Sequence, residues 1–182
     1  MSGHNKWAQI KRKKEVTDKK RSQIFSKLLK AISIAAKNDS NPNYNPILKS
    51  AIERAKEFNV PQENIERAIK KSSDLENIKE ILIEAYGPEG TALLIEVQTD
   101  NSNRSVAEIK KILNEHGGKW GDPGSVTWAF EKTDKGYLAK FPQKIQLSSE
   151  ERLIKLMEAL DDHDDVVEIY SSADLENDGQ DK

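Results

Sequence analysis

Apolar residues in the first half of the chain recur at the spacing of amphipathic helices. Between residues 16 and 73 they fall three or four positions apart in three segments, the first of which carries Ile24, Leu28, Ile32 and Ala36. This spacing places them on one face of a helix. Residues 38–43 and 59–61 separate the segments, and both are rich in the Asn and Pro of turns. The pattern predicts a three-helix domain over residues 16–73.

The apolar period changes to that of β-strands in the second half of the chain. Strands are predicted at residues 81–86, 92–97, 126–131 and 166–170, with a weaker one over 137–147. The mostly apolar stretch 92–97 is typical of a central strand. Residues 87–90, Gly-Pro-Glu-Gly, are predicted to form a hairpin turn.

Two helices are predicted between these strands. One carries Val106, Ile109, Ile112 and Leu113 and the other Leu153, Leu156, Met157 and Leu160. Ser105 with Glu108 fits a capping box at the start of the first helix. The order ββαβ-βαβ predicts an α+β sandwich domain over residues 77–171, with helices on one face of a mainly antiparallel sheet.

The two ends of the chain lack this periodicity. Residues 1–15 are predicted to form a basic N-terminal arm, and the polar, acidic residues 172–182 a disordered tail. The formal net charge of −2 conceals the contrast between the two ends. Residues 1–71 hold 17 basic and 7 acidic residues, whereas the remainder holds 12 and 24. A basic region joined to an acidic one indicates a polyanionic partner for the first.

Composition also excludes several classes of protein. There is no cysteine and no apolar run near the ~20 residues of a membrane span, so we expect a cytoplasmic protein with no membrane partner. The three histidines are scattered, and the acidic run 161–165 lacks the loop glycine and terminal Glu of an EF-hand. We therefore predict no enzyme, no metal and no cofactor. A metal-dependent nucleic-acid-processing enzyme is the weakest alternative.

The candidate nucleic-acid-binding residues lie in the first thirty positions, which hold ten basic and two acidic residues. Cations at this density are typical of phosphate contact, because each neutralised phosphate releases a condensed counterion. The predicted contacts are Lys6, Lys11, Arg12, Lys13, Lys14, Lys19, Lys20, Arg21 and Lys27. Trp7 lies among them, and two hypotheses stand for it: its indole stacks on an exposed base, or it anchors the arm to the helical domain.

A possible second anion site lies between a predicted strand and a predicted helix. Its residues are Asn101, Asn103 and Arg104. A helix N-terminus with a cation beside it favours an anion. Ordinary turn and capping chemistry explains the same residues, and is slightly favoured over the anion site.

Several stretches resemble the YebC family of regulatory proteins, which includes the mitochondrial translational activator of cytochrome oxidase subunit I. They run in order along the chain: Gly3-His4-Asn5-Lys6-Trp7-Ala8-Gln9-Ile10-Lys11, then residues 61–69, 86–90, 99–104, 116–118 and 124–126. The resemblance implies a regulator of gene expression that acts in transcription at promoter DNA, or in translation at the ribosome by relief of stalling. Members usually carry a third domain, and this chain is expected to lack it near residues 132–137.

Residue chemistry favours RNA over promoter DNA. The sequence shows no helix-turn-helix and no dimerisation seam. A basic arm with an aromatic residue suits irregular RNA. We therefore expect a monomeric, ribosome-associated RNA-binding regulator of translation, with DNA-binding transcriptional regulation as the alternative.

Overall fold

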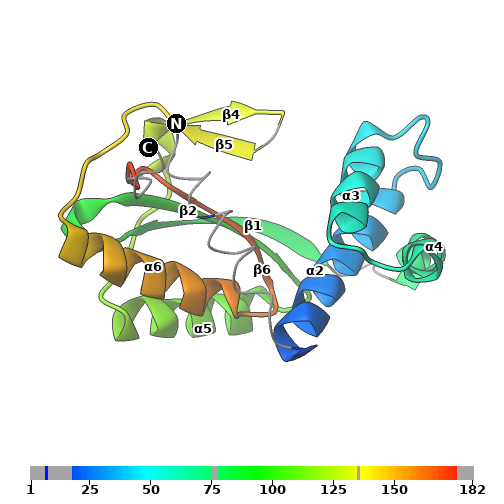
Figure 1. Cartoon of the computed structure of the whole chain (residues 1–182), viewed down its shortest axis with the longest axis horizontal. Helices are drawn as coiled ribbons and strands as arrows, with labels where there is room; N and C mark the ends of the chain where they lie inside the picture. Colours follow the sequence, from blue (N-terminus) through cyan, green and yellow to red (C-terminus); the bar gives the residue numbers. More distant parts are fainter. Residues whose placement is uncertain (1–6, 8–17, 75–77, 135, 176–182) are drawn as a thin grey trace, which may run out of the picture. The chain divides into compact units, whose positions relative to one another are not determined.

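The computed structural model describes residues 7, 18–74, 78–134 and 136–175 (Figure 1). Contacts divide these residues into two units. One comprises residues 18–74 with Ile78, and the other comprises Trp7 with residues 79–175. Trp7 thus belongs to the unit whose other residues lie more than seventy positions further along the chain.

The first unit consists of three helices, as the apolar spacing predicts. They are α2 (Asp18–Ala36), α3 (Pro46–Glu57) and α4 (Gln62–Lys70), followed by the 3₁₀ turn η1 (Lys71–Asp74). Their core includes Ile32, Leu48 and Ile65, each at most 1% exposed. The buried Ser33 hydroxyl donates to the carbonyl of Ala68 at 2.7 Å and ties α2 to α4. Apolar burial on all three helices stabilises the unit.

The second unit has the predicted α+β fold, with two helices on one face of an antiparallel sheet (Figure 1). The sheet order is β3-β1-β2-β6, from β1 (Lys79–Tyr86), β2 (Ala92–Thr99), β3 (Lys119–Trp120) and β6 (Val166–Ser171). Helices α5 (Ser102–Glu115) and α6 (Leu147–Asp161) cover one face. Strand β2 lies between β1 and β6, which confirms the central position predicted from its apolar run.

The hairpin of β4 (Phe130–Thr133) and β5 (Gly136–Ala139) lies on the other face of the sheet (Figure 1). It pairs with no strand of the larger sheet among the described residues. Phe130 packs there against Leu94 and Tyr170. Successive residues of β2 therefore serve two cores, Leu93 and Ile95 under the helices and Leu94 under the hairpin.

The prediction of one strand over 126–131 is wrong for its first half. Thr127–Ala129 form the 3₁₀ turn η3, and Trp128 is 63% exposed. The cause lies on β1, where the Glu84 carboxylate accepts the backbone N–H groups of Val126 and Thr127. These N–H groups are then unavailable to a strand ladder.

Three further sequence predictions need correction. The weaker strand over 137–147 ends at Ala139, and residues 140–146 form no strand beyond one bridge at Gln143. Helix α5 begins at Ser102 with Asn101 as its N-cap, so Ser105 lies inside it and caps nothing. Residues 172–175 belong to the fold and not to a disordered tail, since Ala173 and Leu175 are core residues. Residues 176–182 lie outside the described part.

Candidate nucleic-acid interface

The predicted cationic surface is only partly within the described residues. Lys6, Lys11, Arg12, Lys13 and Lys14 lie outside them, and Lys19 and Lys20 are described only as part of the backbone of α2. Arg21 is exposed, and its guanidinium carbon lies 5.4 Å from the centre of the Phe25 ring. Lys27 is half-buried on the same helix. α2 therefore carries Arg21 with its charge in solvent and its position supported by an aromatic ring.

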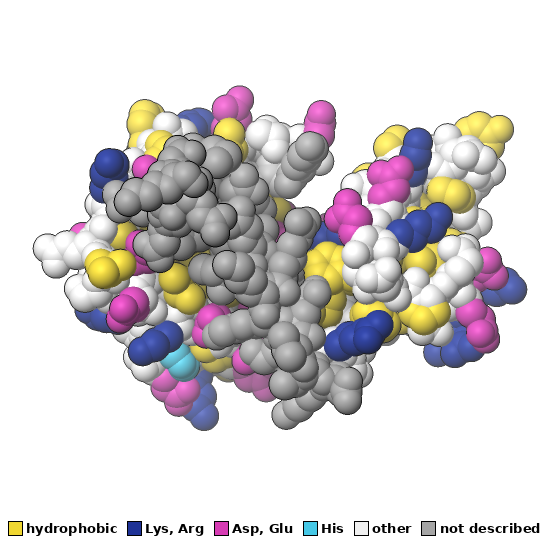
Figure 2. Space-filling model, in the orientation of Figure 1, with side chains coloured by type: hydrophobic (Ala, Val, Ile, Leu, Met, Phe, Trp, Pro, Cys, Tyr) yellow, Lys and Arg dark blue, Asp and Glu magenta, His cyan; other side chains and the backbone are white. Residues whose placement is uncertain are grey.

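Charge differs between the two units. Residues 18–74 hold twelve basic and seven acidic residues, whereas residues 79–175 hold eleven and nineteen. Figure 2 shows Lys and Arg side chains spread over the visible face of the three-helix unit, with exposed hydrophobic side chains between them. On α4, however, Arg67 is paired with Glu63 at 2.9 Å, so that cation is already engaged at the helix surface.

Trp7 is not exposed as a base-stacking residue. Its side chain is 2% exposed and belongs to the core cluster that includes Ile83, Ile95 and Leu113. This cluster lies in the α+β unit, so the structure supports neither base stacking nor anchoring to the helical domain. The surrounding cations suggested a solvent-exposed arm, and no local pattern signals a cavity built by such distant residues.

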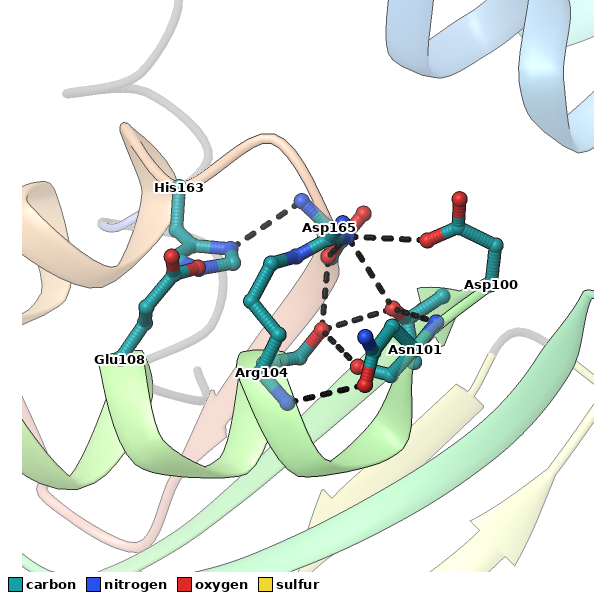
Figure 3. Close-up of polar contacts among 8 residues, drawn as sticks. Asp100, Asn101, Arg104, Glu108, His163 and Asp165 are labelled. Atoms are coloured by element: carbon teal, nitrogen blue, oxygen red, sulfur yellow. Dashed lines mark hydrogen bonds and ion pairs between the residues drawn. The ribbon is translucent and has the colours of Figure 1, made fainter.

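The predicted second anion site is an internal network at the N-terminus of α5 (Figure 3). The Asn101 amide oxygen accepts the backbone N–H of Arg104 at 3.1 Å and caps the helix. The Arg104 guanidinium lies between two carboxylates, 3.0 Å from Asp100 and 2.9 Å from Asp165. The hydrogen bond that Arg104 donates to the Asp165 carboxylate is the largest influence on the Arg104 pKa, and it raises that pKa. Asn103 is exposed beside them. These contacts argue against a free anion site.

The same network joins three elements of the α+β unit. The buried Ser105 Oγ lies 2.7 Å from both Thr99 Oγ1 at the end of β2 and Asp165 Oδ2 before β6. His163 Nδ1 accepts the backbone N–H of Asp165, so its proton lies on Nε2, 2.8 Å from Glu108. Asp165 and His163, two members of the run 161–165, therefore have structural partners. Among the described residues there is no group of three or more His, Asp or Glu arranged to hold a metal ion.

Sequence reasoning missed a loop that is organised by a buried carboxylate. Glu84 on β1 is 8% exposed and accepts backbone N–H groups from Gly124, Val126 and Thr127. Burial by itself would raise its pKa, but these three donors outweigh burial and lower it. Trp128 follows directly, with its indole N–H donating to the Ser125 carbonyl at 2.8 Å. A Glu within an apolar strand was the available signal, but its partners lie forty or more residues away.

A second missed feature is an acidic pocket on the hairpin side of the sheet. The pocket has a volume of about 290 Å³ and is lined by Glu80, Leu82, Glu96, Lys132 and Tyr137, among others. Burial raises the pKa of Glu96, and Glu168, its partner in the sheet register, raises it further. The Tyr170 hydroxyl lies 3.4 Å from the Glu96 carboxylate and opposes that shift. Two glutamates against one lysine make the lining net acidic, and such a lining repels phosphate.

The described residues thus define a two-unit protein, with a basic three-helix unit and an acidic α+β unit. Two family models match it, the TACO1/YebC protein N-terminal domain over residues 5–75 and the TACO1/YebC second and third domain over residues 78–138. The chain belongs to the TACO1/YebC family. No helix among the described residues is long and apolar enough to cross a membrane.

Individual relatives agree with this membership. A probable transcriptional regulatory protein of Pseudothermotoga lettingae is 44% identical over 183 residues, which cover 96% of this chain and 71% of the relative. One of Dictyoglomus thermophilum is 48% identical, covering 85% of this chain but only 62% of the relative. The crystal structure of a conserved hypothetical protein, Aq1575 from Aquifex aeolicus, has a TM-score of 0.78 at 26% identity and covers 91% of this chain and 95% of that one. The chain therefore spans roughly two thirds of the length of these two curated relatives.

Proposed function

We propose that this protein is a non-enzymatic regulator of gene expression that binds nucleic acid through its basic N-terminal region. The observation that carries the proposal is the separation of charge, with ten basic and two acidic residues among the first thirty and an excess of acid beyond residue 78. The names of the relatives describe regulatory proteins and not enzymes. The proposed contacts include Lys11, Arg12, Lys13 and Lys14, together with Arg21 and Lys27 of α2.

Within this function we favour binding to RNA and action in translation at the ribosome. A basic unit with exposed side chains suits the irregular phosphate spacing of folded RNA. The acidic α+β unit is kept from phosphate by repulsion, so it orients the molecule. Transcriptional regulation at promoter DNA is the second candidate, and the printed names of the relatives favour it.

We also propose that the chain functions without the third domain inserted in other family members. The support is the tight β4–β5 hairpin, in which Thr133 pairs with Gly136 at the position expected for the insertion. Contacts that such a domain makes elsewhere would then be absent from this protein or supplied by a partner.

Co-sedimentation with ribosomes at near-physiological salt tests the proposal, with the natural chain compared with a variant in which Lys11, Arg12, Lys13 and Lys14 are all Glu. We expect the natural chain to sediment with ribosomes and the variant to remain at the top of the gradient. For about six phosphate contacts, log K should fall with log[salt] with a slope of about −4 to −5. A slope near zero would refute the electrostatic account. Failure to sediment, together with a selective shift of promoter DNA, would favour the transcriptional alternative.

A further inference from the structure

The loop between α2 and α3 is held rigidly by its own asparagines. The amide nitrogen of the buried Asn45 donates to the carbonyls of Ala35 at 2.8 Å and Asp39 at 2.7 Å. Its amide oxygen accepts the backbone N–H of Leu48 at 3.0 Å and so caps α3. Asn41 accepts backbone N–H groups from the residues that follow it. One buried amide thus joins the end of α2, the loop and the start of α3.

This rigid loop exposes two large apolar side chains. Tyr44 is 78% exposed and Ile47, in the first turn of α3, is 72% exposed. Among described residues 18–74 they are the only exposed large hydrophobic side chains. Residues on each side of them are buried, Asn45 in the hydrogen-bond network and Leu48 in the core. Because hydrogen bonds already hold the loop backbone, binding of a ligand to Tyr44 costs little entropy for ordering that backbone.

The charge around this loop indicates the chemistry of the ligand. The loop lies in the basic unit, between the exposed Lys37 and Lys49, with Asp39 as the one acid within residues 37–50. An exposed aromatic ring between cations fits a nucleobase whose phosphates the cations contact. In a duplex both faces of a base are covered, so the base must be unpaired. Trp7, the aromatic residue of the predicted arm, is buried and cannot serve this purpose in the described fold.

We propose that Tyr44, supported by Ile47, stacks on an unpaired base of RNA bound by the basic unit. This inference rests on the proposed function and adds a means of preferring single-stranded or looped RNA over duplex. Phosphate contacts alone bind both forms. The stacking contact therefore supplies the selection for unpaired RNA that the lysines and arginines cannot supply.

The test measures binding of the full chain to a fluorescein-labelled single-stranded oligoribonucleotide and to a fully paired RNA duplex of the same length. The variants are Tyr44→Ala, Tyr44→Phe and, as a matched control, Phe141→Ala. Phe141 is 64% exposed and lies in the acidic α+β unit, so its replacement removes an exposed ring without touching the loop. Unfolding of each variant is measured in parallel; with Tyr44 in solvent, Tyr44→Ala should leave stability unchanged.

We expect Tyr44→Ala to weaken binding to the single strand by about 5- to 100-fold, the range for loss of one base–aromatic stack. Tyr44→Phe keeps the ring and should bind like the natural chain, as should Phe141→Ala. Duplex binding should be unchanged. In a single strand that carries 2-aminopurine, the natural chain should quench the fluorescence of that base, whereas the Tyr44→Ala variant should not.

Several results would overturn the inference. These are an unchanged single-strand affinity for Tyr44→Ala, an equal loss on the duplex, or an equal loss in Phe141→Ala. In each case salt-dependent binding of the natural chain would leave the proposed function standing. If the natural chain binds neither RNA, the proposed function fails and this inference fails with it.

Discussion

Glu84 is a buried carboxylate whose negative charge organises a loop. Three backbone N–H groups from Gly124, Val126 and Thr127 converge on its two oxygens. A glutamine cannot reproduce this arrangement, because its amide nitrogen would face an N–H donor. We expect Glu84→Gln to destabilise the α+β unit by about 1.5–3 kcal/mol, the range for hydrogen bonds to charged groups. Urea unfolding followed by circular dichroism would measure the change.

The same carboxylate should make stability depend on pH. Its pKa is lowered in the folded state, because the three N–H donors outweigh the burial that raises it. The stability it contributes is thus fully present above the ordinary glutamate pKa of 4.5 and is lost as pH falls through the lower folded value. In Glu84→Gln this part of the acid dependence should vanish.

Glu96 is the matched control, because its pKa shifts in the opposite direction. Burial, and then repulsion from Glu168, raise the pKa of Glu96. Ionisation of Glu96 therefore opposes folding. The stability that its protonated form contributes is present at low pH and is lost as pH rises through the raised pKa. Glu96→Gln should leave the unit as stable or more stable at neutral pH. If both variants lost stability equally, the difference in environment described here would be refuted.

At the scale of elements, α5, β2 and β6 are joined by one hydroxyl. Ser105 contacts Thr99 and Asp165, the second a carboxylate that Arg104 also holds. We expect Ser105→Ala to lower the unfolding free energy by about 1–3 kcal/mol, the range for weakening a buried polar network. Asn103→Ala is the control, since Asn103 is exposed two residues earlier on the same helix. Equal stability of the two variants in urea would show that the network contributes nothing.

The elements also show what the sequence could predict. Helix α2 and strand β2 follow from the local apolar pattern alone, because α2 buries an apolar face and β2 is buried on both of its faces. The segment 126–131 alternates like a strand, yet its first half does not form one. Its backbone N–H groups donate instead to the carboxylate of Glu84, which is more than forty positions away. The partners of Arg104 were hidden for the same reason, since Asp165 lies 61 positions further on. Local pattern determines an element only where no distant polar group competes for its backbone.

At the scale of the whole molecule, Trp7 is buried in the core of the α+β unit, far in sequence from the other members of that core. Its ring is 2% exposed. Trp7→Ala should therefore destabilise that unit by about 3–5 kcal/mol, as expected for removing a buried aromatic residue. Hydrogen exchange of the β2 amides would report the loss, while the amides of α2 to α4 should be little affected.

Trp128→Ala is the control for this prediction, because Trp128 lies in the same unit but is 63% exposed. Its effect on β2 exchange should be small. If Trp7→Ala leaves β2 protected and weakens RNA binding instead, Trp7 functions at the surface and the burial described here does not govern its role.

The burial of Trp7 has a consequence for how the chain matures as it is synthesised. Residue 7 leaves the ribosome before every other residue of its core cluster, whereas Ile169 on β6, a member of the same cluster, is made 162 positions later. The helices of residues 18–74 have all their partners long before then, so they can fold while synthesis continues. The core of the α+β unit cannot be completed until β6 has been made. Before then β2 lacks β6 as a neighbour, and the Trp7 indole lacks part of the core that buries it. The two units therefore fold in sequence: the three-helix unit can fold during synthesis, and Trp7 is buried only after β6 has been made.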